Sequence, residues 1–194
     1  ASMKRNATID LVKDNLGECG KIVIFTGRKK DCEQIGAALV KALKTTKIWP
    51  AHGGTSVGLR DAIREDYMAH SGPCVLVGTG DAWGEGVNLH DTDLLLIVML
   101  PYTPGQIRQW EGRVARHGQK RPVLIQYILA EGSVDEHVAS LLLNKLPAVE
   151  KIVNDQELDS FGSDLNSGDD DGKLLEQLTS MVQAGNAMSD GSGD

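Results

Sequence analysis

The sequence predicts an α/β protein in three layers, with a parallel sheet covered by helices on both faces. Two observations carry this prediction. Short apolar runs alternate with helical patterns along the chain, and most of these runs are continuous. Continuous apolar runs are typical of strands buried on both faces, and a regular alternation of strand and helix favours a parallel sheet.

Five apolar runs are predicted as strands. They are residues 21–26, 47–51, 73–78, 93–100 and 122–129. In parallel sheets of this kind, ligands bind at the carboxyl ends of the strands. The loops after Thr26, Ala51, Gly78 and Leu100 are therefore the first places to look for a site.

Helical patterns fill the intervals between the predicted strands. Residues 31–44 form one of them, with an apolar stripe made of Ile35, Leu39, Val40 and Leu43. Further helices are predicted over residues 6–16, 56–67, 104–116 and 133–145.

Two of these helices carry signals for their first residue. Ser56 is expected to be the N-cap of the helix that it precedes. Ser133 and Glu136 have the spacing of a capping box, in which the side chain of each residue accepts a hydrogen bond from the backbone N–H of the other.

The net charge of −7 is unevenly distributed along the chain. Residues 154–194 hold ten acidic residues and one lysine, so residues 1–153 carry a net charge of +2. Any nucleic-acid footprint must therefore be a local patch. We interpret residues 1–3 as an expression scar, 4–153 as one folded lobe and 154–194 as a largely flexible acidic tail. The pattern of 173–184 allows one short helix within that tail.

The three cysteines, Cys19, Cys32 and Cys74, are scattered and form no CxxC pair. Neither a zinc site nor a disulfide framework is therefore expected, and no metal is assigned to this chain's own residues. No apolar run approaches the length of a membrane span, and no secretory signal is visible. We expect an intracellular protein without a membrane partner.

Residues 109–119 (QWEGRVARHGQ) hold the strongest chemical signal. Arg113 and Arg116 are three residues apart and share a helix face with Gln109. Two guanidinium groups in this arrangement can bind a polyphosphate and stabilise the charge that develops in phosphoryl transfer. An isolated RxxR is usually a solvated helix face, so the assignment depends on the neighbouring segments.

Four segments together resemble the motifs of superfamily 2 helicases. The pattern QxxGRxxRxGQ at 109–119 resembles motif VI, and its Gly-Gln ending is most similar to SWI/SNF-type DNA translocases. Residues 77–89 resemble motif V, 22–27 motif IV and 51–60 the HG…S…R segment after the second strand. All four occur in the family's order. The resemblance implies a RecA-like lobe of the P-loop NTPase type that lacks the P-loop and works with an N-terminal RecA-like lobe.

The resemblance also implies which residues face the nucleotide. Arg113 and Arg116 would be arginine fingers that Gln109 helps to position, and Mg-ATP would be bound mainly by the first lobe. The motif V residues that would contact the nucleotide are Glu85, Gly86 and Asn88. This segment is one residue longer than the family pattern, which leaves open how Thr79, Asp81 and Glu85 divide their roles.

A nucleic-acid surface is assigned to the loops at the strand ends. Its residues are Thr26, Gly27, Gly53, Gly54 and Thr79, whose backbone N–H groups and hydroxyls suit phosphate oxygens without reading bases. Trp110 is expected to pack in the core. For Trp83 two roles stay open, packing in the core and stacking on a base. The histidines near these loops are expected to make ordinary hydrogen bonds.

An independent ATP site is absent from the sequence. No GxxxxGK[ST] occurs, and the nearest approach, at residues 17–21, is too short and precedes a strand. The DEH at 135–137 opens a helix, where acidic residues favour the helix dipole, so it is interpreted as structural. The chain is therefore expected to hydrolyse no ATP without a separate first lobe.

These features predict the second motor lobe of an ATP-dependent helicase or translocase that acts on nucleic acid, with double-stranded DNA favoured. An RNA helicase lobe stays open as an alternative within the same class. A non-catalytic scaffolding domain, which would use the acidic tail to engage a basic partner, is the alternative from a different class.

Overall fold

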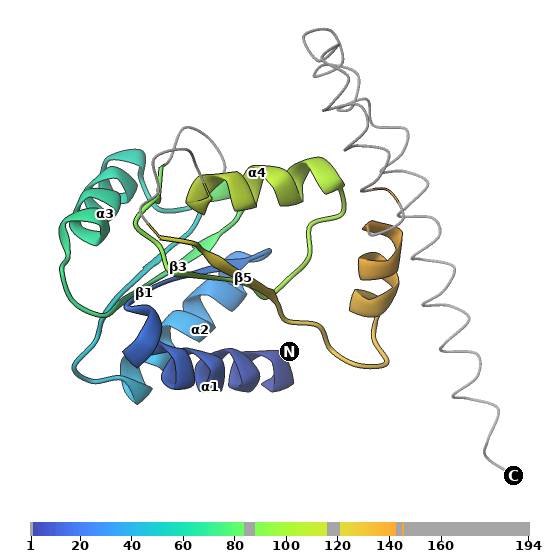
Figure 1. The fold of residues 1–194 in the computed structure, drawn as a ribbon, viewed down its shortest axis with the longest axis horizontal. Helices are drawn as coiled ribbons and strands as arrows, with labels where there is room; N and C mark the ends of the chain where they lie inside the picture. Colours follow the sequence, from blue (N-terminus) through green and yellow to red (C-terminus); the bar gives the residue numbers. More distant parts are fainter. Residues whose placement is uncertain (1, 84–87, 116–120, 143–144, 146–194) are drawn as a thin grey trace, which may run out of the picture. The chain divides into compact units, whose positions relative to one another are not determined.

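The computed structural model describes residues 2–83, 88–115, 121–142 and 145. Figure 1 draws these residues as a ribbon. The predicted domain boundary at residue 153 and the predicted helix at 173–184 lie outside the described residues.

The chain divides into two compact units. One unit contains residues 1–101 and 105–136, and the other contains residues 102–104 and 137–194. The first unit holds the sheet and nearly all of the described residues, and it is the lobe considered below. In the second unit, residues 137–142 are helical.

A five-stranded parallel sheet forms the centre of the lobe, as the sequence predicts. Its strands are β1 (Lys21–Thr26), β2 (Lys47–Ala51), β3 (Cys74–Thr79), β4 (Leu94–Ile97) and β5 (Leu124–Tyr127). The strand order is β2-β3-β1-β4-β5, and every neighbouring pair is parallel. All carboxyl ends therefore lie at one edge of the sheet, which we call the carboxyl edge. The loops that carry the predicted site begin there.

Helices cover both faces of this sheet (Figure 1), which confirms the predicted three-layer α/β architecture. α1 (Ser2–Cys19) and α2 (Lys29–Ala42) pack on one face, and α3 (Val57–Ala69) and α4 (Pro104–Val114) pack on the other. Two buried cores result, because alternate residues of β1 point to opposite faces. Ile22 and Ile24 join the α1–α2 core, whereas Val23 and Phe25 join the α3–α4 core.

The edge strands are less buried than the sequence suggested. β1, β3 and β4 are buried along their whole length, but β2 and β5 each expose part of theirs. The predictions of strands at 93–100 and 122–129 are too long, because β4 and β5 pair over four residues each. The predicted helix at 6–16 is too short, since α1 extends from Ser2 to Cys19.

The buried stripe of α2 differs from the predicted one at one position. Val40 is 53% exposed, so its assignment to the stripe is wrong. Cys32 and Gly36 take part instead, together with Ile35 and Leu39. A Cβ at Gly36 would lie within van der Waals overlap of the Pro50 ring, so the glycine allows α2 to lie close to β2.

The two predicted helix caps differ from their expected form. Ser56 is the N-cap of α3 but makes no side-chain cap hydrogen bond. The Ser133 hydroxyl accepts from the Asp135 N–H at 3.2 Å, and the Asp135 carboxylate accepts from the Ala130 N–H at 3.2 Å. The Ser133 hydroxyl thus accepts from Asp135, one residue before the predicted Glu136, and the Asp135 carboxylate caps the N–H of Ala130 and not that of Ser133.

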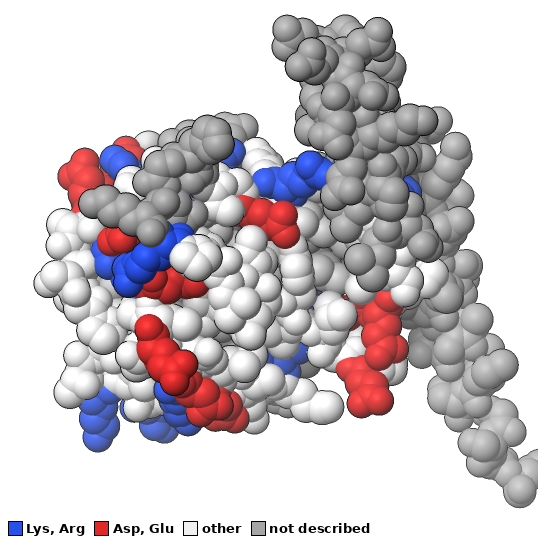
Figure 2. Space-filling view, viewed as in Figure 1, with Lys and Arg blue, Asp and Glu red and all other residues white. Residues whose placement is uncertain are grey.

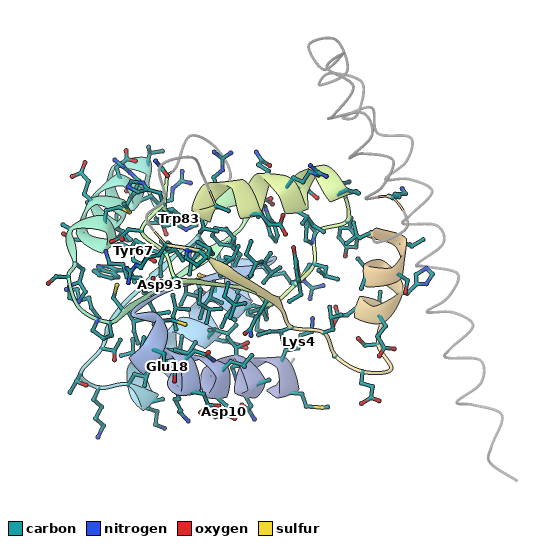
Figure 3. All side chains as sticks on the ribbon, in the orientation of Figure 1. Lys4, Asp10, Glu18, Tyr67, Trp83 and Asp93 are labelled. Atoms are coloured by element: carbon teal, nitrogen blue, oxygen red, sulfur yellow. The ribbon has the colours of Figure 1, made fainter. Side chains whose placement is uncertain are left out.

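A buried lysine ties together the amino edge of the sheet, opposite the carboxyl edge. Lys21 Nζ donates to the carbonyls of Tyr67 at 2.9 Å and Met68 at 3.0 Å, where α3 ends, and pairs with Asp91 at 2.7 Å. The Asp93 carboxylate accepts from the Lys21 N–H at 2.9 Å. Figure 3 labels Tyr67 and Asp93 at this edge. The side chains of Lys21, Asp91 and Asp93 and the last carbonyls of α3 thus close this end of the lobe, and we call them the amino-edge clamp.

Two buried thiols give a prediction about pH. Burial is the main cause that raises the pKa of Cys32 and of Cys74 to about 11. The folded protein therefore keeps protons that the unfolded chain releases above about pH 8.5, the pKa of an exposed thiol. Stability is expected to fall as the pH rises from about 8.5 to about 11, since the unfolded state then binds fewer protons.

Urea denaturation across this pH range measures the effect. The double variant Cys32→Ala, Cys74→Ala should lose part of the fall, because its unfolded chain has two fewer thiols to ionise. An equal fall in the double variant would show that other groups cause it.

Within the part of the chain that the structure describes, no helix is long and apolar enough to cross a membrane. The same residues contain no group of three His, Cys, Asp or Glu side chains that could hold a metal ion.

Candidate functional site: the carboxyl edge and helix α4

The ends of β1 and β3 bring two of the predicted nucleic-acid residues together. Thr26 is the direct partner of Thr79 in the strand register, and the Gly80 N–H donates to the Thr26 carbonyl at 3.1 Å. Both threonines are buried. The Thr26 hydroxyl donates within the protein, to the carbonyls of Gly78 at 3.2 Å and Arg28 at 3.3 Å. Thr26 therefore fixes the path of the chain into Gly27, which is partly exposed.

The loop after β2 presents two exposed glycines, Gly53 and Gly54. Its shape is held by His52, whose Nδ1 accepts from the Gly54 N–H at 3.0 Å and whose backbone N–H donates to Thr55 Oγ1 at 3.1 Å. His52 Nε2 lies 3.2 Å from Glu33 Oε1 on α2. Ordinary hydrogen bonding is thus confirmed for His52. Gly53 lies in open space, with no atom within 4 Å of a Cβ placed there.

Three exposed cations accompany these glycines, and the sequence-based assignment did not include them. Arg28, Lys29 and Lys30 are consecutive at the start of α2. Lys29 Nζ lies 3.4 Å from the position of a Cβ on Gly54, so the lysine reaches across to the β2 loop. The first turn of a helix also carries partial positive charge. The signal in the sequence was the GRKK that directly follows a strand.

Acidic side chains occur both beside these cations, where Glu33 Oε1 lies 3.8 Å from Lys29 Nζ, and in a separate row on α1. Asp10, Asp14 and Glu18 are exposed and spaced four residues apart on α1. Figure 2 shows acidic residues in a row over this helix, and Figure 3 labels Asp10 and Glu18. Phosphates would be repelled by this face, whereas the start of α2 would attract them.

Arg60 joins two of the motif segments. It lies on α3, and its Nη1 donates to the carbonyl of Ala82, in the short 3₁₀ turn Asp81–Trp83 that follows β3. The HG…S…R segment and the motif V segment are thus in contact through a side chain.

Both tryptophans of the motif segments are buried. Trp83 packs over Gly78, and its Nε1 donates to the Ala51 carbonyl at 3.1 Å. Trp110 packs over Gly80 and meets the Phe25 ring edge to face, with 5.9 Å between the ring centroids. A Cβ on either glycine would overlap the indole ring above it. The expected packing of Trp110 is confirmed, and Trp83, which is fully buried and is labelled in Figure 3, also packs.

Three of the residues predicted to face the nucleotide are described, two on α4 and one in the segment before β4, and they form a second group. Gln109 is exposed on α4, whereas Arg113 is 9% exposed and makes interactions within the protein. The Arg113 carbonyl accepts from the Leu89 N–H at 2.9 Å. The adjacent Asn88 has a buried Oδ1 with no hydrogen-bond partner among the described residues. Glu85, Gly86 and Arg116 lie outside the described residues.

The sequence and the fold both match a known family. Residues 3–118 match the helicase conserved C-terminal domain. The chain belongs to this family, the C-terminal domain of superfamily 2 helicases, and SWI/SNF-related proteins are among its relatives.

Individual relatives agree with this assignment. The uncharacterized ATP-dependent helicase YqhH of Bacillus subtilis is 34% identical over 112 residues, which cover 58% of this chain and 19% of that protein. The SWI/SNF-related matrix-associated actin-dependent regulator of chromatin subfamily A-like protein 1 of Xenopus tropicalis is 28% identical over 152 residues, or 75% of this chain and 15% of that protein. The chain thus spans about a fifth or less of the length of these relatives.

Solved structures share the fold. The C-terminal part of the Fun30 ATPase domain superposes with a TM-score of 0.63 at 24% identity, over 71% of this chain and 44% of that one. Domain 2 of the DEAD-box helicase Mss116p, in a structure bound to an RNA duplex, gives a TM-score of 0.56 at 19% identity, over 64% of this chain and 49% of that one. The RecA-like fold predicted from the motifs is confirmed.

Proposed function

We propose that this chain is the second motor lobe of an ATP-dependent translocase that tracks double-stranded DNA. The observation that carries the proposal is the convergence of three loops at the carboxyl edge. Gly27 follows β1, Gly53 and Gly54 follow β2, and Thr79 ends β3. Loops of this composition offer backbone N–H groups to phosphate oxygens, and such contacts grip a strand without reading its sequence.

The cations at the start of α2 supply the charge for this grip. Arg28, Lys29 and Lys30 are exposed beside the glycine loops, and the acidic row of α1 lies elsewhere. A local cluster of this kind provides the salt-dependent attraction to phosphates that a near-neutral lobe needs. Thr26, which is buried, acts by holding Gly27 in place. Duplex DNA is favoured because one of the relatives is named a regulator of chromatin.

The second group of residues fits a role toward ATP that is held mainly by another lobe. Arg113 and Gln109 lie on α4, and the amide oxygen of Asn88 can accept from a donor such as a ribose hydroxyl. The described residues offer no acidic cluster for Mg²⁺. ATP with Mg²⁺ supplies the energy for movement. We assign Arg113 and Arg116 the role of stabilising the charge spread over the transferred phosphoryl group, Gln109 the role of positioning them, and Glu85 and Gly86 the role of contacting the nucleotide.

The proposed cycle follows from these two groups. Closure of the two lobes would bring the guanidinium groups of Arg113 and Arg116 to the phosphates, and opening would withdraw them. Because the carboxyl-edge loops belong to the same lobe, each closure would shift their grip along the strand.

Charge reversal at the start of α2 tests the nucleic-acid surface. The variant Arg28→Glu, Lys29→Glu is expected to weaken binding to DNA of any sequence and to reduce the slope of log K against log salt by about 2. Binding of the purified chain to a fluorescent duplex, followed by anisotropy over a range of salt, measures both quantities.

The matched control reverses Lys41 in the last turn of α2 and Lys44, two residues after its end. Lys41→Glu, Lys44→Glu changes the net charge equally, at exposed positions away from the carboxyl edge. Equal weakening by both double variants would show that net charge alone matters and would remove the assigned surface. A tighter complex with an RNA duplex than with a DNA duplex would overturn the DNA assignment while leaving the lobe a motor lobe.

A further inference from the structure

We propose that Trp110 is a positioning residue that transmits nucleic-acid contact at the ends of β1 and β3 to the arginine-bearing helix α4. The proposal deepens the function proposed above and rests on it. Its basis is a juxtaposition: one buried indole ring touches both strand ends that carry the assigned grip, and Arg113 lies one helical turn further along.

The ring of Trp110 lies against the residues next to Thr26 and Thr79. Phe25, which precedes Thr26, meets the ring edge to face at 5.9 Å with an interplanar angle of 68°. Gly80, which follows Thr79, lies so close to the six-membered part of the indole that no Cβ fits between them. The Gly80 N–H donates to the Thr26 carbonyl, so the two strand ends are also bound to each other. Any shift of these ends therefore presses on the same ring.

The other end of this contact is the helix that carries Arg113. Trp110 and Arg113 are three residues apart on α4, so they lie on the same helix face. Trp110 is 3% exposed and Arg113 is 9% exposed, so this face is packed against the lobe. Protein interiors are close-packed and of low compressibility, so a displaced side chain moves its neighbours. A displacement of the Trp110 ring therefore displaces the turn of α4 that sets the position of the Arg113 guanidinium group.

The indole N–H distinguishes Trp110 from the neighbouring Trp83. Trp83 Nε1 donates to the Ala51 carbonyl at 3.1 Å, which anchors that ring to β2. Trp110 Nε1 is buried and has no hydrogen-bond partner among the described residues. Among the described residues, Trp110 is held by packing, so a movement of its ring with α4 breaks none of their hydrogen bonds. A rigid aromatic ring that no hydrogen bond holds in place is suited to transmit small movements between the segments that it contacts.

NMR of the ¹⁵N-labelled chain tests the proposal. Three signals are followed while a DNA duplex is added: the indole N–H of Trp110, the buried Nε–H of Arg113, assigned with Arg113→Lys, and the indole N–H of Trp49. Trp49 is the internal control because it packs against Tyr67 and His70. The signals of Trp110 and Arg113 are expected to shift, and that of Trp49 to stay in place. Anisotropy on the same samples reports whether the duplex is bound.

Two variants separate transmission from simple support of the fold. Trp110→Phe keeps an aromatic plate and should retain the Arg113 shift, whereas Trp110→Leu should lose it at equal saturation with duplex. The proposal is overturned if the duplex binds without moving Arg113, or if Trp110→Leu shows the full shift. Failure of the duplex to bind would instead refute the proposed function, and the inference with it. If Trp110→Leu does not fold, the wild-type chain and Trp110→Phe still decide, since absence of the Arg113 shift in either one refutes transmission.

Discussion

Replacement of Arg113 by alanine, in a two-lobed protein that carries this chain, is expected to lower nucleic-acid-stimulated ATP hydrolysis by about 10³-fold. An arginine that reaches the transferred phosphoryl group in the transition state contributes an effect of this size. Steady-state turnover with saturating duplex measures it. Arg113→Lys should recover little of the activity, because an ammonium group cannot make the two parallel hydrogen bonds of a guanidinium group.

Two controls accompany this prediction. Arg121→Ala removes an arginine at the amino edge, where its side chain is exposed and pairs with Asp93 at 3.2 Å, and it should leave turnover close to wild type. The chain without a first lobe should hydrolyse no appreciable ATP, since it has no phosphate-binding loop. Robust turnover by the purified chain that is abolished by Arg113→Ala would contradict the assignment of ATP to another lobe.

Substitution of Gly80 by alanine is expected to destabilise the lobe by about 1–3 kcal/mol, the usual effect of forcing extra volume into a packed core. The added methyl group would overlap the Trp110 ring, which has Phe25 on another side. Gly80 does not have a positive φ, so the loss would come from overlap and not from backbone strain. Urea denaturation followed by tryptophan emission gives the free energy of unfolding.

Gly53→Ala is the matched control for this substitution. It makes the same chemical change on the same edge of the sheet, but a Cβ at Gly53 has nothing within 4 Å. The control variant should therefore stay within about 0.5 kcal/mol of the wild type, as surface substitutions usually do. Equal stability of the two variants would mean that the Trp110 ring moves aside at no cost.

The architecture could be predicted from the sequence because its signals are local. Runs such as KIVIFT show burial on both faces by themselves, and β1 and β2 have the predicted bounds. Predictions were less accurate where contacts with other helices or strands determine which side chains are buried. Val40 fits an apolar stripe by spacing, but the position of β2 turns Cys32 and Gly36 inward instead.

The candidate site was predictable in its parts but not in its contacts. Motif order identified Gly53, Thr79 and Arg113, since each belongs to a segment with a recognisable pattern. The motifs do not show that the Thr26 hydroxyl is already engaged, nor that Gly54 and Lys29 approach each other across two elements. Such contacts depend on strand order, which places β2 beside β3 and β3 beside β1. Short-range sequence patterns do not indicate the order of the strands in the sheet.

The amino-edge clamp has a practical consequence for the salt titrations proposed above. Lys21 is 5% exposed and is held by two carbonyls as well as by Asp91, so dissolved ions screen it far less than they screen the exposed cations at the start of α2. Raising the ionic strength should therefore release a bound duplex well before it loosens the lobe. The slope of affinity against salt then reports the number of phosphates that the folded lobe contacts.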